Sequence, residues 1–255
     1  MQLIQSKPSL YNNFKFIVLT NDFFLYQKSL FGTGCMKGII FDFNGTLFWD
    51  SDNNTKAWIS FSGTLRDHPL TNEEMKILNG RNNRAFLEYI VGRKITEDEY
   101  EKWSEGKEVI YRKNCKEDHE NFHVAPGLTD LLDFLKEKHI PMGIASMAGE
   151  GNINFYIDNF HLLNWFDKKN IIFDDGKIPG KPDPTIYLLA AKQLNLDPKD
   201  CVVVEDSPHG IESAQRAGIG MIISLGHEKD LNELIAKYGV HSNINDFTEF
   251  DRNIF

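Results

Sequence analysis

The sequence has few cysteines, no long apolar run and no excess of positive charge. Its three cysteines, Cys35, Cys115 and Cys201, are widely spaced without a C-x-x-C pair, which argues against a disulfide framework or a zinc ribbon. No stretch approaches the roughly 18 uncharged apolar residues that a membrane span requires. The formal net charge of −9 argues against a nucleic-acid-binding surface. These absences predict a protein of a reducing cytoplasm with neither a membrane nor a nucleic acid as its partner.

The 255 residues are 41 % hydrophobic and 25 % charged, which is typical of a soluble globular protein with one large domain or a core and a smaller module. The hydrophobic pattern changes at Met36, where a continuous strand pattern, MKGIIFDFNGTLF, begins. Residues 1–35 carry three lysines and one aspartate, whereas the remainder is strongly acidic. We therefore expect residues 1–35 to be an upstream extension outside the fold; the alternative is an arm that packs on the core.

From residue 37 onward, one strand is followed by a long helical segment and then by alternating helices and strands. Apolar runs predict strands at 37–43, 141–145, 170–173, 201–204 and 220–224. Helical patterns occupy 55–63, 71–78, 83–91, 97–114, 128–139, 183–194, 208–217 and 229–237. In one of them Thr96 and Glu99 have the spacing of a capping box. The alternation predicts an α/β fold with a parallel sheet covered on both faces, with ligands at the carboxyl ends of its strands.

Polar residues stand at these predicted strand ends. Asp42 and Asn44 end the first strand, Ser146 follows the second, Lys181 precedes a proline, and Glu205-Asp206 ends the fourth. A carboxylate nucleophile, a cation, a hydroxyl and two further acids on one rim suit phosphoryl transfer assisted by a divalent metal. Taken singly, each of these residues is an ordinary turn or helix cap, and only their combination indicates chemistry.

Four ordered segments, FDFNGTLF, GIAS, GKPDP and VVVEDSPHGIESAQRAG, resemble the motifs of the haloacid dehalogenase-like hydrolases. The resemblance is to the β-phosphoglucomutase-like phosphatase branch and covers residues 36–255. It implies a Rossmann-like parallel-sheet core made of residues 36–51 and 124–255. It also implies an all-helical cap domain, inserted at residues 52–123.

The resemblance further implies roles for particular residues. The catalytic residues would be Asp42, which attacks phosphorus, Asn44, Ser146, which binds a phosphoryl oxygen, and Lys181, which orients Asp42. Mg²⁺ would be held by Asp42, the backbone carbonyl of Asn44, Glu205 and Asp206. The substrate, a small phosphorylated metabolite, would contact Thr46, Gly80, Arg81, Asn82 and Ala148. A monomer is the expected assembly.

Asn44 departs from the family pattern, in which the residue two after the nucleophile is an aspartate that acts as general acid and base. An amide cannot transfer a proton, and such assistance is worth about 10²–10⁴-fold in rate. We therefore expect a slow or specialised phosphatase of sugar-phosphate type. A phosphate-binding pseudoenzyme or regulatory module is the alternative, and sugar-phosphate mutase activity is disfavoured because it depends on the missing aspartate.

Overall fold

The computed structural model describes residues 35–78, 82–226 and 231–255. By its internal contacts the chain separates into residues 1–35 and residues 36–255, and the description below concerns the second unit. The prediction for residues 1–35 falls outside the described residues, apart from Cys35. None of the described helices combines the length and the apolarity that crossing a membrane requires.

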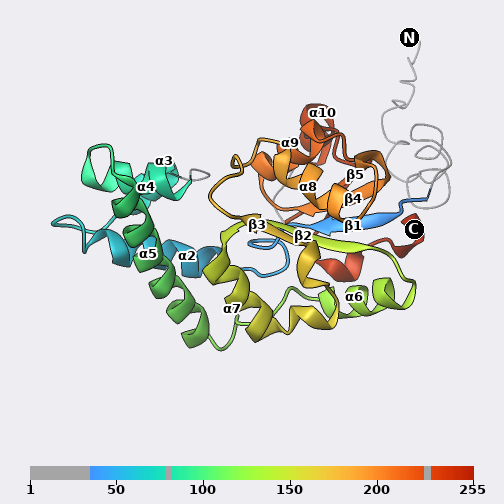
Figure 1. Cartoon of the computed structure of the whole chain (residues 1–255), viewed down its shortest axis with the longest axis horizontal. Helices are drawn as coiled ribbons and strands as arrows, with labels where there is room; N and C mark the ends of the chain where they lie inside the picture. Colours follow the sequence, from blue (N-terminus) through green and yellow to red (C-terminus); the bar gives the residue numbers. More distant parts are fainter. Residues whose placement is uncertain (1–34, 79–81, 227–230) are drawn as a thin grey trace, which may run out of the picture. The chain divides into compact units, whose positions relative to one another are not determined.

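Within the described residues, six parallel strands form one sheet in the order β3-β2-β1-β4-β5-β6 (Figure 1). The strands are β1 (Gly38–Phe41), β2 (Met142–Gly149), β3 (Ile171–Asp174), β4 (Cys201–Glu205), β5 (Met221–Leu225) and β6 (Ser242–Ile244). In the register of β1 with its two neighbours, Phe41 pairs with Ile144 and with Val204. The residues that follow these positions therefore meet at one edge of the sheet, and the predicted α/β class is confirmed.

Helices cover both faces of the sheet (Figure 1). Ile39 and Phe41 of β1 pack on the face covered by α6 (Leu128–Glu137) and α7 (Glu150–Phe160). Ile40, between them in sequence, packs on the other face, since successive side chains of a strand point to opposite sides. That face is covered by α8 (Thr185–Gln193), α9 (Pro208–Arg216) and α10 (Leu231–Tyr238).

Four helices lie between β1 and α6 in the described part of the chain, and we call them the helical insert. They are α2 (Ser51–Ser62), α3 (Asn72–Leu78), α4 (Asn83–Val91) and α5 (Glu97–Glu117). The insert has a hydrophobic cluster of its own, in which the rings of Trp58 and Phe86 stack with their centroids 4.4 Å apart. The predicted capping box begins α5: Thr96 Oγ1 accepts from the Glu99 amide, and a Glu99 carboxylate oxygen accepts from the Thr96 amide.

The sequence patterns do not predict helix α7 or strand β6. Helix α7 contains a glycine and several asparagines, which are poor helix formers, but it is stabilised by the burial of Ile153, Tyr156 and Ile157 against the core. Strand β6 is three residues long and largely polar, and it forms because β5 offers it an edge to pair with. The other α-helices and strands lie within a few residues of their predicted positions, β2 being four residues longer at its carboxyl end, whereas the short 3-10 helices were not predicted.

Candidate active site

Lys181 joins two carboxylates at the carboxyl end of the sheet. Asp42 directly follows β1 and Glu205 is the last residue of β4, so the pairing of these strands brings the two acids together. Lys181 Nζ lies 2.6 Å from Asp42 Oδ1 and 2.7 Å from Glu205 Oε1, and all three side chains are buried. The same ammonium donates to the hydroxyl of Tyr187 on α8, 3.0 Å away, and to the carbonyl of Ala145 at 3.3 Å. Lys181 thus holds the carboxylate of Asp42 in a fixed orientation.

The electrostatics of this cluster are dominated by an excess of negative charge. Burial favours the neutral form of Lys181, but Asp42 and Glu205 outweigh it and raise the pKa of the ammonium well above its usual value, so it stays charged. The pKa of Asp42 is also raised, first by burial and then by the charges of Glu205 and Asp206, against the opposing effect of Lys181. One cation therefore does not neutralise the three carboxylates.

The start of α9 holds Glu205 in place. Glu205 Oε2 accepts hydrogen bonds from the amide and the hydroxyl of Ser207, at 2.6 and 3.0 Å. Gly210 lies directly behind the carboxylate, and a Cβ on it would stand 1.5 Å from Glu205 Oε1. The absence of a side chain at position 210 is what allows Glu205 to reach the rim.

Asp206 faces the turn after β1. Thr46 Oγ1 donates to Asp206 Oδ1 at 3.1 Å. Gly45 has φ +82°, and a Cβ at this position would lie 2.4 Å from Asp206 Oδ2, so both the backbone conformation and the space favour glycine. Thr46, predicted to contact substrate, is buried against this acid.

Asp42, Glu205 and Asp206 form an acidic group that can hold a metal ion. One carboxylate oxygen from each lies within 4.8 Å of the other two. Hard divalent cations prefer carboxylate ligands, and a bound cation would offset the charge that Lys181 leaves uncompensated. The predicted fourth ligand, the backbone carbonyl of Asn44, stays a prediction.

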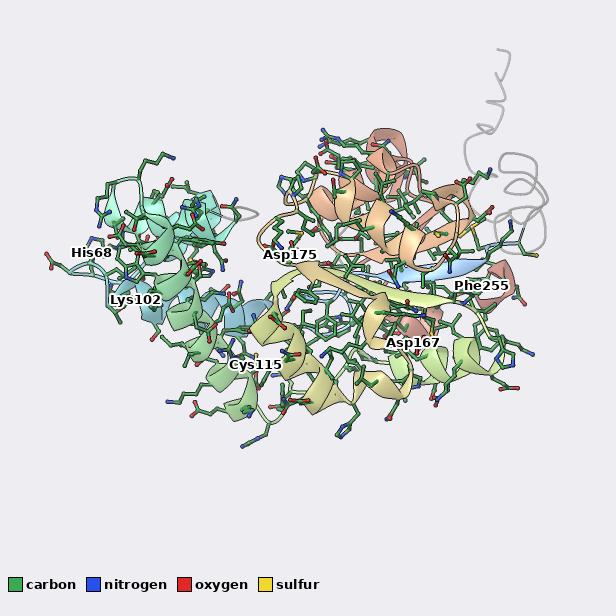
Figure 2. The ribbon with its side chains drawn as sticks, viewed as in Figure 1. His68, Lys102, Cys115, Asp167, Asp175 and Phe255 are labelled. Carbon is green, nitrogen blue, oxygen red and sulfur yellow. The ribbon has the colours of Figure 1, made fainter. Side chains whose placement is uncertain are left out.

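The side chain of Asn44 lies in a polar network that the sequence did not reveal. Its Nδ2 donates to Asp50 Oδ2 at 2.8 Å and to the hydroxyl of Tyr156 on α7 at 2.7 Å, with the hydroxyl of Tyr111 on α5 at 3.4 Å. Its Oδ1 accepts from Ser146 Oγ at 3.4 Å. Figure 2 labels Cys115, one helical turn beyond Tyr111 on α5. No pattern in the sequence points to the two tyrosines, but Asp50 closely follows the first motif.

Asp50 is 4 % exposed, and its two carboxylate oxygens accept two hydrogen bonds besides the one from Asn44. Tyr111 donates to Oδ2 at 2.6 Å, and the amide of Gly45 donates to Oδ1 at 3.1 Å. Burial raises the pKa of Asp50, while the bonds from Tyr111, Asn44 and Gly45 act in the opposite direction. The hydroxyls of Tyr111 and Tyr156 are themselves 3.0 Å apart.

The remaining predicted residues fall in three places. Ser146 and Ala148 lie at the end of β2, where the register shifts, and the Ala148 amide donates to Ser146 Oγ at 3.1 Å. Asn82 is the N-cap of α4, and its side-chain oxygen accepts from the Ala85 amide. The predictions for Gly80 and Arg81 lie outside the described residues.

Lys107 of α5 is a buried cation that sequence reasoning missed. It is 3 % exposed, donates to Asn54 Oδ1 at 3.0 Å and pairs with Glu108 at 2.6 Å. It also lies over the ring of Trp58. A lysine on a polar helix gives no sequence signal of burial, because the composition of α5 resembles a solvated surface.

Comparison with known proteins identifies the family. The sequence model of the haloacid dehalogenase-like hydrolases matches residues 36–218. The chain belongs to this family. The match confirms the resemblance carried by the four motifs.

Individual relatives of these hydrolases cover most of the chain. The phosphorylated carbohydrates phosphatase of Thermotoga maritima is 27 % identical over 210 residues, which are 80 % of this chain and 92 % of the relative. The β-phosphoglucomutase of Bacillus subtilis is 29 % identical over 195 residues, 72 % of this chain and 81 % of the relative. A solved haloacid dehalogenase-like hydrolase of family IA, variant 3, from Entamoeba histolytica is 36 % identical, with a TM-score of 0.79, and covers 86 % of this chain and 97 % of its own.

Proposed function

We propose that the protein is a Mg²⁺-dependent phosphatase of small phosphorylated metabolites, of sugar-phosphate type, that acts through an aspartyl-phosphate on Asp42. The observation that carries this proposal is the bridge from Lys181 Nζ to Asp42 Oδ1 and Glu205 Oε1 beside the acid Asp206. It combines an oriented nucleophile, a fixed cation and a site for a divalent metal, which are the parts that phosphoryl transfer requires.

The charge balance supports the metal assignment. Lys181 contributes one positive charge against the carboxylates of Asp42, Glu205 and Asp206, and a phosphate monoester would add further negative charge to the same rim. Asp42, Asp206, Glu205 and the carbonyl of Asn44 would hold Mg²⁺, whose oxygen preference they meet. When bound, the ion supplies positive charge opposite the non-bridging phosphoryl oxygens.

The residues of the rim then have distinct roles. The oxygen of Asp42 that is not bonded to Lys181 attacks phosphorus, and the bond from phosphorus to the leaving oxygen breaks as that oxygen takes a proton from a water molecule, because the amide of Asn44 does not transfer one. The hydroxyl of Ser146, now directed at Asn44 Oδ1, can turn to donate to a phosphoryl oxygen, with the neighbouring amide of Ala148 as a second donor. Water then attacks the aspartyl-phosphate, which releases inorganic phosphate and regenerates the carboxylate of Asp42.

The insert and the names of the relatives support the proposed substrate class. We propose that α2–α5 act as a cap that closes over the substrate and excludes bulk water from the intermediate. Relatives are named for phosphorylated carbohydrates and, in Escherichia coli, for hexitol phosphates.

The proposal is tested by steady-state hydrolysis of p-nitrophenyl phosphate and a panel of sugar and sugar-alcohol phosphates by the full chain. Assays with Mg²⁺ and with a chelator measure the metal requirement. Asp42→Asn removes the nucleophile without changing its size, and Asp158→Asn, at an exposed position of α7, is the matched control. Acid quenching followed by peptide mass spectrometry detects phosphate on Asp42.

We expect hydrolysis that requires Mg²⁺, is abolished in Asp42→Asn and is retained in Asp158→Asn. Turnover that survives Asp42→Asn contradicts the covalent mechanism. A wild-type protein that binds phosphate in calorimetry but turns over no substrate contradicts the proposed activity and supports the pseudoenzyme alternative. Isomerised rather than hydrolysed sugar phosphate would identify a mutase.

A further inference from the structure

Asn44 occupies the position at which the family has its proton carrier, yet its side chain is bonded on every side. The nitrogen Nδ2 is directed at Asp50 Oδ2 and Tyr156, at 2.8 and 2.7 Å. The oxygen Oδ1 is directed at Ser146 Oγ, the predicted ligand of the phosphoryl group. The two ends of the amide therefore face different surroundings. The nitrogen faces buried protein groups, and the oxygen faces the carboxyl end of the sheet, where the substrate would bind.

The chemistry of Asp50 decides which end of the amide faces which side. An ionised carboxylate only accepts hydrogen bonds, whereas an amide donates through nitrogen and accepts through oxygen. If the amide of Asn44 were turned over, its oxygen would face the carboxylate oxygen of Asp50 at contact distance, and one hydrogen bond would become a repulsion. Asp50 thus fixes the amide with nitrogen inward and oxygen toward Ser146.

Asp50 is in turn held so that it cannot turn away. Its Oδ2 accepts from Tyr111 at 2.6 Å and its Oδ1 accepts from the amide of Gly45 at 3.1 Å, in the tight turn that carries Asn44 itself. The side chain is 4 % exposed, so water does not substitute for these donors. The network connects the turn after β1 to α5 of the insert and to α7 of the core.

We propose that Asp50 and Tyr156 are positioning residues that hold Asn44 as a hydrogen-bond acceptor at the reaction rim. Oδ1 of Asn44 then accepts from the water that attacks the aspartyl-phosphate, and orients it without taking its proton. This inference rests on the proposed phosphatase function. It assigns Asn44 a part in the reaction that the loss of the aspartate does not remove.

Two conservative variants test the proposal. Asp50→Asn keeps the size of the side chain but has one acceptor oxygen for donors that now bond to two, so the orientation of Asn44 is no longer enforced. Tyr156→Phe removes one acceptor of Asn44 Nδ2 and leaves Asp50 in place. The matched control is Asp118→Asn, because Asp118 accepts from the amide of Asn53 at 3.1 Å in a similar carboxylate–amide pair that does not include Asn44.

The first readout is independent of turnover. Side-chain amide signals of ¹⁵N-labelled asparagine are recorded by NMR, and that of Asn44 is assigned by its absence in Asn44→Asp. We expect slow hydrogen exchange of Asn44 Nδ2 in the wild type and in Asp118→Asn, and exchange at least tenfold faster in Asp50→Asn. Fast exchange in the wild type, or unchanged exchange in Asp50→Asn, overturns the proposal.

The second readout is the separation of kcat from KM with p-nitrophenyl phosphate and the best substrate of the panel. We expect kcat to fall about tenfold in Asp50→Asn and about threefold in Tyr156→Phe, the size of one hydrogen bond, with KM changed less than twofold. The double variant Asn44→Asp/Asp50→Asn, which exchanges amide and carboxylate, is compared with them for stability and not for kcat, because its carboxylate at position 44 adds a proton carrier. A folded Asp50→Asn variant with unchanged kcat overturns the positioning role. A wild-type protein without hydrolysis overturns the proposed function and, with it, the catalytic part of this inference. In that case the NMR result still decides the orientation of Asn44.

Discussion

Replacing Asn44 with aspartate should destabilise the protein in a pH-dependent way, although it restores the residue that the family has at this position. The new carboxylate oxygen would stand where Nδ2 now lies, 2.8 Å from Asp50 Oδ2. Two charges about 4 Å apart repel by about 4 kcal/mol at an effective dielectric constant of 20. The pair therefore shares one proton, and the protonated member donates the hydrogen bond that the amide donates now.

The sign of the pH dependence follows from the raised pKa of this pair. A carboxyl whose pKa is raised in the folded state does not lower the free energy of unfolding at pH values below its unfolded pKa. Above the unfolded pKa, the free energy of unfolding falls by about 1.4 kcal/mol for each pH unit until the folded pKa is passed. We expect Asn44→Asp to lose about 1.5 kcal/mol of unfolding free energy at pH 5 and about 4 kcal/mol at pH 8. Urea unfolding of wild type and variant at the two pH values measures both.

The exchanged variant Asn44→Asp/Asp50→Asn is the control, because it keeps one carboxylate and one amide in contact. Its stability should lie within about 1 kcal/mol of wild type at both pH values, and its kcat should exceed that of wild type by about 10²-fold or more, since it carries a proton carrier at position 44. Equal destabilisation of Asn44→Asp at pH 5 and pH 8, or none at pH 8, would refute the reasoning. Because Asn44-Gly45 is prone to deamidation, peptide mass spectrometry must accompany each preparation.

Three further changes test the remainder of the site and the insert. Lys181→Met leaves the buried acids Asp42 and Glu205 without their cation, and should lower the unfolding free energy by about 3–5 kcal/mol in chemical denaturation. Added Mg²⁺ should recover part of the loss, and unchanged stability would contradict the bridge. Gly210→Ala places a Cβ 1.5 Å from Glu205 Oε1 and should weaken Mg²⁺ binding in calorimetry. Gly149→Ala, whose Cβ meets nothing within 4 Å, should not weaken it, and equal effects of the two variants would argue against the contact with Glu205. Thr96→Ala removes the capping box of α5 and should cost about 1 kcal/mol in urea unfolding with kcat unaltered, and a loss of kcat would link the start of α5 to catalysis.

The rim of the site could be predicted from the sequence because topology alone assembles it. Asp42 follows β1 and Glu205 ends β4, and parallel strands that pair in register bring such residues to one edge. Lys181, from the loop before α8, completes the cluster, with Nζ 2.6 Å from Asp42 and 2.7 Å from Glu205. Short-range patterns were equally sufficient for the capping box at Thr96, which depends on residues three positions apart.

The surroundings of Asn44 could not be predicted, because they depend on how helices from distant parts of the chain pack over the rim. Tyr111 and Tyr156 are 67 and 112 residues away from Asn44, and both tyrosines lie on helices that bury other side chains as well. A tyrosine on a buried helix face is ordinary core packing in sequence, and only the register of α5 and α7 against the turn after β1 brings the two hydroxyls to the amide.

This difference changes how the substitution at position 44 is understood. From the sequence alone, Asn44 is interpreted as a substitution that removes a proton carrier. In the structure, it is one member of a pair, since Asp50, only six residues away, supplies a buried carboxylate to which the amide donates. An aspartate at position 44 would put two negative charges in that space, so the amide is the residue that the existing partners accept. The cost of restoring the family residue is therefore set by Asp50, and the two positions can be understood only together.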